Sequence, residues 1–155
     1  MWLKFVLGGA LIAFCVLLGY FAAGKYRSRK KFYAQFHAFN ERYLTELSYA
    51  RKPLSAFLKE YEYTGDFAKS IKEFEEKREL RHKLSFLNKD EQGEFSDYLS
   101  MLGKGDAQSQ KGYFTAKKGV LEEKKTSSEK EAKDRSSLYL KLGLLAGLAF
   151  VILIV

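Results

Sequence analysis

The sequence has 155 residues, one cysteine and a formal net charge of +8 at pH 7. This length allows one small domain with accessory segments, and a single cysteine excludes a disulfide framework and a Cys-x-x-Cys site. All 19 acidic residues lie between Glu41 and Asp134, and residues 32–137 hold 20 bases against 19 acids. Because the basic excess lies outside this region, the sequence argues against a nucleic-acid-binding face.

The first element predicted along the chain is a membrane-spanning helix within residues 1–24. Phe5 to Ala23 is a run of 19 residues without a charge. As a helix it would be roughly 28 Å long, close to the ~30 Å hydrocarbon core of a bilayer. A cleaved signal peptide is the alternative, but its apolar region would be too long, and bases follow closely. We expect a retained anchor.

A basic juxtamembrane segment, residues 25–31, follows this apolar run. Its five bases are Lys25, Arg27, Arg29, Lys30 and Lys31. Bases flanking a membrane span stay on the cytoplasmic side, and Lys133, Arg135 and Lys141 flank the second apolar run on the same side. Both ends therefore predict a cytoplasmic middle domain with both termini outside. The five bases and Lys141 are expected to set this topology and to meet lipid head groups.

Residues 32–137 are predicted to form the middle domain, an all-α bundle of about five or six helices. One face of a helix from about residue 30 to 50 is marked by apolar residues at helical spacing: Phe32, Phe36, Phe39, Tyr43 and Leu47. Another helix is expected after Pro53, and a further one with Asp66 as its N-cap, ending near Lys83. Two more are expected after Asn88, with Glu91 completing its cap, and after Gly105-Asp106.

The helix predicted to end near Lys83 carries a cluster of acidic side chains. These are Glu73, Glu75, Glu76 and Glu79. A solvated face paired with nearby lysines and arginines is the simpler interpretation. An acidic docking surface for a partner protein is the functional alternative.

Residues 138–155 are predicted to form a second membrane segment. Its uncharged part begins at Leu142 and spans 14 residues, about 21 Å of helix, which is short for a bilayer. Lys141 can extend to the head groups and Tyr139 can sit at the interface, so the effective span is longer. A full span is expected, with an interfacial or re-entrant segment as the alternative.

Small residues recur at four-residue spacing in both apolar segments. Gly143 and Gly147 form a GxxxG pair in the second, and Gly9 and Ala13 form a related pair in the first. Small side chains let two membrane helices approach closely. These faces are therefore predicted to pack against other membrane helices, in this chain or in a homo-oligomer.

No catalytic, metal or cofactor site is predicted. The sequence lacks GxxxxGK[ST], GxSxG and HExxH, and its two histidines, His37 and His82, are isolated. Adjacent carboxylates such as Glu122-Glu123 would point about 100° apart on a helix and could not share a substrate. We expect a protein that is not an enzyme and has no small-molecule substrate.

A resemblance to a known family rests on motifs along the whole chain. The N-terminal run continues through Gly24-Lys25-Tyr26-Arg27-Ser28-Arg29, and Thr45-Glu46-Leu47-Ser48-Tyr49 precedes Pro53-Leu54. Leu102-Gly103-Lys104-Gly105-Asp106 and Gln110 follow, and the chain closes with Leu138-Tyr139-Leu140-Lys141-Leu142-Gly143-Leu144-Leu145-Ala146-Gly147. The chain resembles the stage III sporulation protein AB family of endospore-forming bacteria. It departs from the family pattern in having Gly105 where a serine is common.

The resemblance implies a role in sporulation. The soluble part of this family is similar to the cytoplasmic helical domain of F-type platform proteins of type II secretion. Family members are encoded beside a secretion-type ATPase, stage III sporulation protein AA, in a set linked to a channel between mother cell and forespore. The chain would then be a platform facing the mother-cell cytoplasm, contacting this ATPase and other products of the same operon, with its termini toward the intermembrane space. A structural scaffold without ATPase coupling is the alternative.

Overall fold

The structure is a computed structural model that describes residues 2–49 and 52–154. Every regular element within these ranges is a helix, which confirms the all-α prediction. In chain order the helices are α1 (Trp2–Ala22), α2 (Gly24–Ser48), α3 (Leu54–Glu60), α4 (Gly65–Lys77), α5 (Lys89–Met101) and α6 (Ala107–Ile154).

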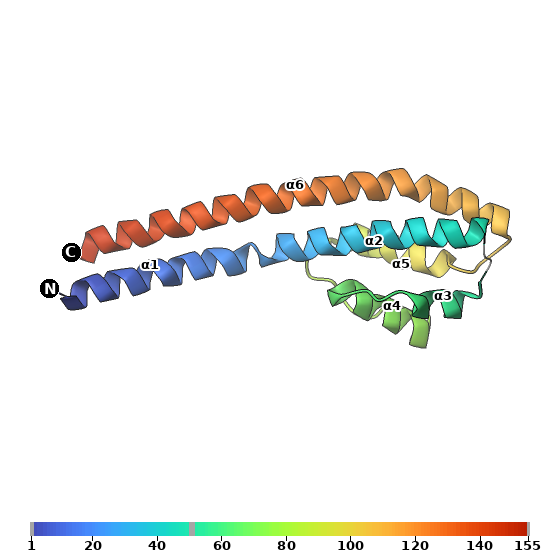
Figure 1. The fold of residues 1–155 in the computed structure, drawn as a ribbon, viewed down its shortest axis with the longest axis horizontal. Coiled ribbons are helices and arrows are strands. Elements are labelled where there is room, and N and C mark those ends of the chain that lie inside the picture. Colours follow the sequence, from blue (N-terminus) through green and yellow to red (C-terminus); the bar gives the residue numbers. More distant parts are fainter. Residues whose placement is uncertain (1, 50–51, 155) are drawn as a thin grey trace.

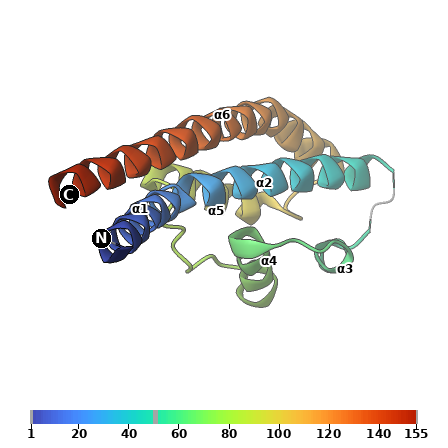
Figure 2. The ribbon, with the colours of Figure 1, turned by 60° about the vertical axis from the view of Figure 1, so that its left-hand side comes forward.

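Two long helical rods run side by side and set the elongated shape of the molecule (Figure 1). One rod is α1 followed by α2, and the other is α6, which at 48 residues is roughly 72 Å long. The rods are antiparallel, so both chain ends lie at the same end of the molecule. The shorter helices α3, α4 and α5 gather along α2 at the opposite end (Figures 1 and 2).

The first rod is nearly continuous across the junction between α1 and α2. The Ala23 amide donates to the Gly19 carbonyl at 3.1 Å, and the Ala23 carbonyl accepts from the Arg27 amide at 3.3 Å. The basic juxtamembrane segment is therefore helical, and α2 begins at Gly24, earlier than the predicted start near residue 30. Lysine and arginine are good helix formers, so this segment contains nothing that would break the helix.

The core of the bundle is built from aromatic side chains. Phe32, Phe36, Phe39 and Tyr43 are all buried, as their spacing on α2 predicts. They meet Phe95 and Tyr98 of α5, Phe67 of α4 and Phe114 of α6, mostly edge to face. Such aromatic pairs contribute roughly 0.5–1.5 kcal/mol each beyond the area they bury.

A buried amide joins three helices inside this core. Asn40 of α2 is fully buried. Its Nδ2 donates to the Phe114 carbonyl on α6 at 3.1 Å, and its Oδ1 accepts from the Tyr98 hydroxyl on α5 at 2.9 Å. Because a buried polar group without a partner is costly, these bonds specify how the three helices pack.

The ends of α4 differ from the sequence prediction. The helix starts at Gly65, with Thr64 at the N-cap and Asp66 already in the first turn, so Asp66 is not the cap. It ends at Lys77 and not near Lys83, because Arg78 adopts a left-handed conformation with φ 57°. The irregular segment that follows buries Leu84, Phe86 and Leu87 in the core. The sequence did not predict this burial, because charged residues precede these three.

The ends of α5 are defined by side-chain bonds. At its start, Asn88 and Glu91 exchange side-chain and backbone bonds, so the predicted cap is confirmed as a full capping box. At its end, Gly103 and Gly105 have φ of 73° and 83°, conformations that favour glycine. The Gln110 side chain on α6 accepts from the Gly103 amide at 3.3 Å and donates to the Gly105 carbonyl at 3.3 Å. The motif that carries the family resemblance here is thus a fixed corner between α5 and α6.

Candidate functional site

The candidate functional site is the hairpin of apolar helices together with the junction that joins it to the bundle. Two helical stretches, Val6–Ser48 and Ala107–Leu153, are long and apolar enough to cross a membrane. Only 11% and 6% of the residues in their most apolar windows are buried within the chain. A core helix of a soluble bundle would be mostly buried, so the hairpin is consistent with a membrane protein.

Glycines line the seam where the two apolar helices touch. A Cβ added at Gly143 would lie 2.7 Å from the carbonyl oxygen of Cys15, and one added at Gly19 would lie 2.5 Å from that of Tyr139. At Gly147 it would lie 3.0 Å from the Cα of Ile12. The two backbones are therefore so close at these points that only glycine fits without a shift.

The register of this seam aligns the two apolar segments in depth. Tyr139 lies opposite Gly19, and Gly143 opposite Cys15. Near the chain ends, a Cβ added at Gly8 would lie 3.4 Å from Val151 Cγ2. Residues 139–151 of the second segment therefore lie opposite residues 8–19 of the first, and Lys141 lies within the hairpin close to its bundle end.

Gly9 and Ala13, the other predicted packing residues, are not on this seam. Both are exposed, and a Cβ added at Gly9 would meet nothing within 4 Å. Their contact with another copy or another membrane protein stays a prediction. Gly8, which the sequence reasoning did not single out, lies on the seam because the hairpin's register places it there.

Aromatic and basic side chains mark the junction between hairpin and bundle. The rings of Tyr26 on α2 and Tyr139 on α6 are stacked, with centroids 6.2 Å apart. The Arg135 guanidinium lies over the Tyr26 ring at 5.9 Å. One turn away, Arg27 donates to the Tyr20 carbonyl at 2.6 Å and lies 3.6 Å from the Tyr20 ring centroid. Tyr26 thus meets Tyr139 and Arg135, which are more than 100 positions away in the sequence, at the same height along the two rods.

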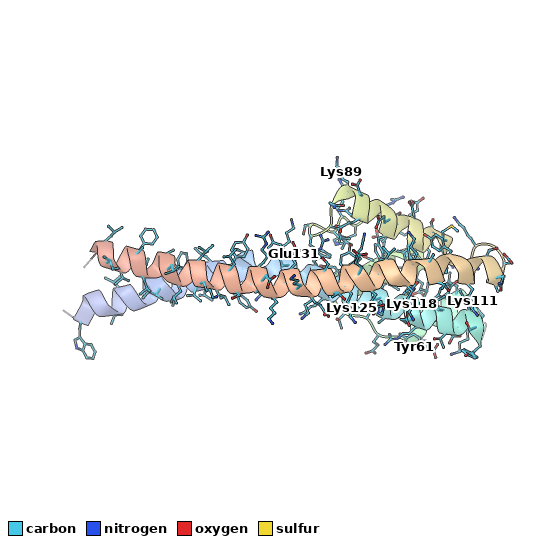
Figure 3. All side chains as sticks on the ribbon, turned by 90° about the horizontal axis from the view of Figure 1, so that it is seen from above. Tyr61, Lys89, Lys111, Lys118, Lys125 and Glu131 are labelled. Atoms are coloured by element: carbon cyan, nitrogen blue, oxygen red, sulfur yellow. The ribbon has the colours of Figure 1, made fainter. Side chains whose placement is uncertain are left out.

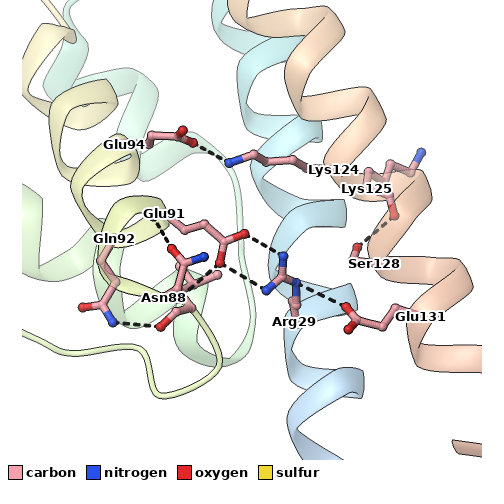
Figure 4. Close-up of polar contacts among 10 residues, drawn as sticks. Arg29, Asn88, Glu91, Gln92, Glu94, Lys124, Lys125, Ser128 and Glu131 are labelled. Carbon is pink, nitrogen blue, oxygen red and sulfur yellow. Dashed lines mark hydrogen bonds and ion pairs between the residues drawn. The ribbon is translucent and has the colours of Figure 1, made fainter. Parts of the chain in front are cut away.

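Arg29 is the central side chain of this junction (Figure 4). Its two terminal nitrogens donate to the two carboxylate oxygens of Glu91 on α5, at 2.6 and 3.1 Å. Its Nε lies 3.7 Å from Glu131 on α6. One guanidinium therefore ties α2 to both neighbouring helices, in the bidentate geometry that makes such pairs strong.

Glu91 has a second function beside this ion pair. Its Oε2 also accepts from the Asn88 amide at 3.1 Å, and its own amide donates to Asn88 Oδ1 at 2.8 Å. The same carboxylate thus caps α5 and joins it to α2. A second ion pair, between Lys124 on α6 and Glu94 on α5, lies one turn further along (Figure 4).

The Tyr33 hydroxyl belongs to the same cluster. Burial raises the pKa of this phenol, and the neighbouring Glu91 carboxylate raises it further. Tyr33 is therefore neutral at physiological pH. Its ring also faces the Arg29 guanidinium at 5.5 Å, so the cation packs against an uncharged surface.

The predicted juxtamembrane bases fall into two groups. Lys25, Lys30, Lys31 and Lys141 are exposed. Arg27 and Arg29 are partly buried and hold the intramolecular contacts described above. Sequence reasoning gave all six the same role because nothing local distinguishes an arginine that pairs with a residue 62 positions away.

The predicted acidic cluster does not form one continuous acidic face. Glu73 accepts from the His82 amide at 3.1 Å and pairs with Lys77, and Glu75 pairs with Lys59 at 3.2 Å. Glu76 and Glu79 are exposed, but Glu79 follows the end of α4. The face is therefore mixed in charge, and Glu76 and Glu79 are its two most accessible carboxylates.

Chemistry-bearing side chains are dispersed over the described part of the chain. No group of three or more His, Cys, Asp or Glu residues within it could hold a metal ion. His37 lies on α2 and His82 in the segment between α4 and α5. The geometry that does bring polar groups together, around Arg29, consists of ion pairs and a helix cap and holds helices in place.

A comparison with protein families decides which family this is. The family model for stage III sporulation protein AB matches residues 67–155, from the first turn of α4 to the last residue of the chain. The chain belongs to the stage III sporulation protein AB family. This membership supports a role in sporulation, and the family is not a known enzyme class. No curated protein and no solved structure matches the chain.

Proposed function

We propose that the chain is a non-enzymatic membrane platform of a sporulation-specific, secretion-like assembly. Its apolar hairpin spans the cell membrane, and its bundle faces the mother-cell cytoplasm, with both termini toward the intermembrane space. The bundle contacts the secretion-type ATPase encoded beside it, stage III sporulation protein AA. No chemistry is required of the platform itself, which agrees with the absence of a catalytic arrangement among the sequence motifs.

The observation that carries this proposal is the continuity of the two rods. Both α6 and the α1–α2 rod pass from the aromatic bundle into the apolar hairpin without an intervening loop. A force applied to the bundle would therefore act on the membrane helices through hydrogen-bonded backbone. A loop at the junction would absorb such a force, so this architecture suits a part that connects a cytoplasmic machine to a membrane assembly.

The orientation of the platform rests on charge. Exposed bases flank both apolar segments on the bundle side of the hairpin, at Lys25, Lys30, Lys31, Lys133 and Arg135. Basic residues close to a span remain on the cytoplasmic side. The similarity of this family to F-type platforms of type II secretion, implied by the resemblance, would place the ATPase on the same side.

For the ATPase contact we propose the face of α4 that carries Glu76, with Glu79 beside it. Both carboxylates are exposed, and α4 lies on the side of α2 opposite to α6 (Figure 1). Lys69, Lys72 and His82 lie around Glu76, and Arg81 lies 3.5 Å from Glu79, so the surface carries both charges. Such a surface fits a transient and salt-sensitive contact with a cycling ATPase better than a permanent one.

The test is binding between the full chain in lipid nanodiscs and the purified ATPase, at low and at physiological salt. The variant Glu76→Lys/Glu79→Lys reverses the proposed contact. Its matched control, Glu122→Lys/Glu123→Lys, reverses two exposed acids on α6. We expect saturable binding that is weaker at physiological than at low salt but still measurable. The first variant should weaken it further, and the control should leave it unchanged.

A structural scaffold without ATPase coupling is the second candidate function, favoured by the same rigid rods. Measuring ATP hydrolysis with and without the platform separates the two. A scaffold would leave the hydrolysis rate unchanged and show no saturable binding, and that result would contradict the coupling proposal. The membrane hairpin and the role in sporulation would stand in either case.

A further inference from the structure

The junction carries a group of exposed basic side chains, which the proposed function uses only to orient the chain. They come from two segments that are distant in sequence, α2 near its start and α6 before its apolar part. We call this set the basic collar: Lys25, Lys30, Lys31, Lys130, Lys133, Arg135 and Lys141. The two segments meet at one level because Tyr26 stacks on Tyr139 and Arg135 lies over Tyr26.

The charge balance at this level is strongly positive. Residues 24–31 and 129–141 together hold nine bases and three acids. One of these acids, Glu131, lies 3.7 Å from Arg29 and so offsets a base outside the collar. The collar itself is exposed, and its charges are available to a ligand outside the chain.

The position of the collar identifies what that ligand is. Lys141 lies on the apolar side of Tyr139, and Lys133 and Arg135 lie on its bundle side along the same helix. Tyrosines at this level are typical of the membrane–water interface. The collar therefore brackets the plane of the lipid head groups on the bundle side.

We propose that the basic collar binds anionic phospholipid head groups selectively, so that the platform carries its own shell of acidic lipid. Clusters of four to eight Lys and Arg immediately cytoplasmic of a membrane helix attract anionic lipid. Here two helices contribute to one cluster, with three of the collar's bases on α2 and four on α6. Lipid phosphates would then screen the repulsion among the lysines, which the bundle does not do. This inference rests on the proposed membrane insertion but not on the ATPase contact.

The test uses the full chain reconstituted in bilayers that contain spin-labelled phosphatidylglycerol or, separately, spin-labelled phosphatidylcholine. Electron paramagnetic resonance gives the fraction of each lipid immobilised at the protein, and hence their relative association constant. Lys25→Gln/Lys30→Gln/Lys133→Gln removes three charges from the collar. The matched control, Lys72→Gln/Lys104→Gln/Lys111→Gln, removes three charges from exposed positions on the bundle. Lys111, for example, lies at the end of α6 far from the hairpin (Figure 3).

We expect the preference for phosphatidylglycerol to drop by roughly threefold or more in the collar variant and to stay unchanged in the control. The preference of the unmodified chain should also disappear in 1 M salt, where the Debye length is about 3 Å. This measurement needs no variant and so does not depend on how a variant folds. Equal immobilisation of both lipids at low salt, or an equal loss in both variants, would overturn the proposal.

Extraction of the reconstituted chain at alkaline pH is measured first. A chain that is released would overturn both the collar and the membrane part of the proposed function. A chain that stays inserted but shows no lipid preference would overturn the collar alone.

Discussion

The glycine seam of the hairpin predicts how substitutions at Gly143 and Gly9 should differ. Isoleucine is well tolerated by a membrane helix, so Gly143→Ile and Gly9→Ile make the same chemical change at two depths of the hairpin. At Gly143 even the Cβ would lie 2.7 Å from the Cys15 carbonyl oxygen, whereas at Gly9 it would meet nothing within 4 Å. The seam should therefore open in the first variant only.

The size of the effect follows from this distance. Carbon–oxygen contacts are comfortable at about 3.3–3.6 Å, so α1 and α6 must separate by roughly 0.6–0.9 Å to admit the Cβ alone. A gap of that size forfeits about a quarter to a half of the dispersion attraction between facing atoms. Since such packing is the main attraction between membrane helices, Gly143→Ile should destabilise the closed hairpin by roughly 1–3 kcal/mol.

Hairpin closure can be measured with the only tryptophan of the chain. Trp2 is exposed near the chain end, where α1 and α6 lie side by side (Figure 1). A nitroxide attached at Leu153→Cys, in a chain with Cys15→Ser, quenches Trp2 fluorescence while the hairpin is closed. The midpoint of an SDS titration should fall for Gly143→Ile and stay unchanged for Gly9→Ile. Equal midpoints in the two variants would refute the reasoning from the seam.

Three further predictions concern the bundle. Arg29→Ala leaves the buried Glu91 carboxylate without its cation and should destabilise the fold by about 2 kcal/mol in thermal or urea unfolding; a double-mutant cycle with Glu91→Gln should show coupling, and additive effects would contradict the ion pair. Asn40→Ala removes the partner of the Tyr98 hydroxyl and should cost roughly 2–3 kcal/mol; a loss below 0.5 kcal/mol would mean that the hydroxyl finds another partner. The pKa of Asp106 is lowered, first by the Ser109 hydroxyl, so its contribution is present above the ordinary carboxyl pKa near 4 and is lost as pH falls through the lowered value. Melting temperature between pH 2 and 6 should therefore fall less steeply on the acid side in Asp106→Asn, and identical profiles would exclude this contribution.

The parts of the fold that depend on local periodicity could be predicted from the sequence. The aromatic stripe on α2 has helical spacing, and it is buried because no other face of α2 is apolar enough to form a core. The capping box at Asn88 has an equally local signature. Both features are decided by residues at most a few turns apart, which is the range over which sequence patterns are informative.

The features that the sequence could not predict depend on which distant residues meet. The end of α4 contains no helix-breaking residue. Instead, the Glu73 carboxylate accepts a hydrogen bond from the His82 amide, and the apolar segment that follows is buried in the core. In the sequence Arg29 cannot be told apart from its basic neighbours, because its partner Glu91 reaches it only through the packing of α5 against α2. The predicted GxxxG residues lie on the hairpin seam, but their partners on α1 follow from the register between helices that are more than 100 residues apart.

The structure also indicates where the bundle and the hairpin can move relative to each other. α6 is a single helix of 48 residues, so bending it sharply would break backbone hydrogen bonds. The other rod has its only interruption among the described residues at Ala23, between α1 and α2, where the bond from the Arg27 amide is stretched to 3.3 Å. A movement of α2 against α6 would therefore hinge near Ala23.

Such a movement would have to act against the contacts on either side of the hinge. On the membrane side the glycine seam holds α1 against α6, and on the bundle side Arg29 joins α2 to both Glu91 and Glu131. Because Glu91 also caps α5, displacing Arg29 would loosen α5 at the same time. The glycine seam and the Arg29 junction therefore keep the two rods together on either side of Ala23, so that a force on the bundle reaches the hairpin along both rods.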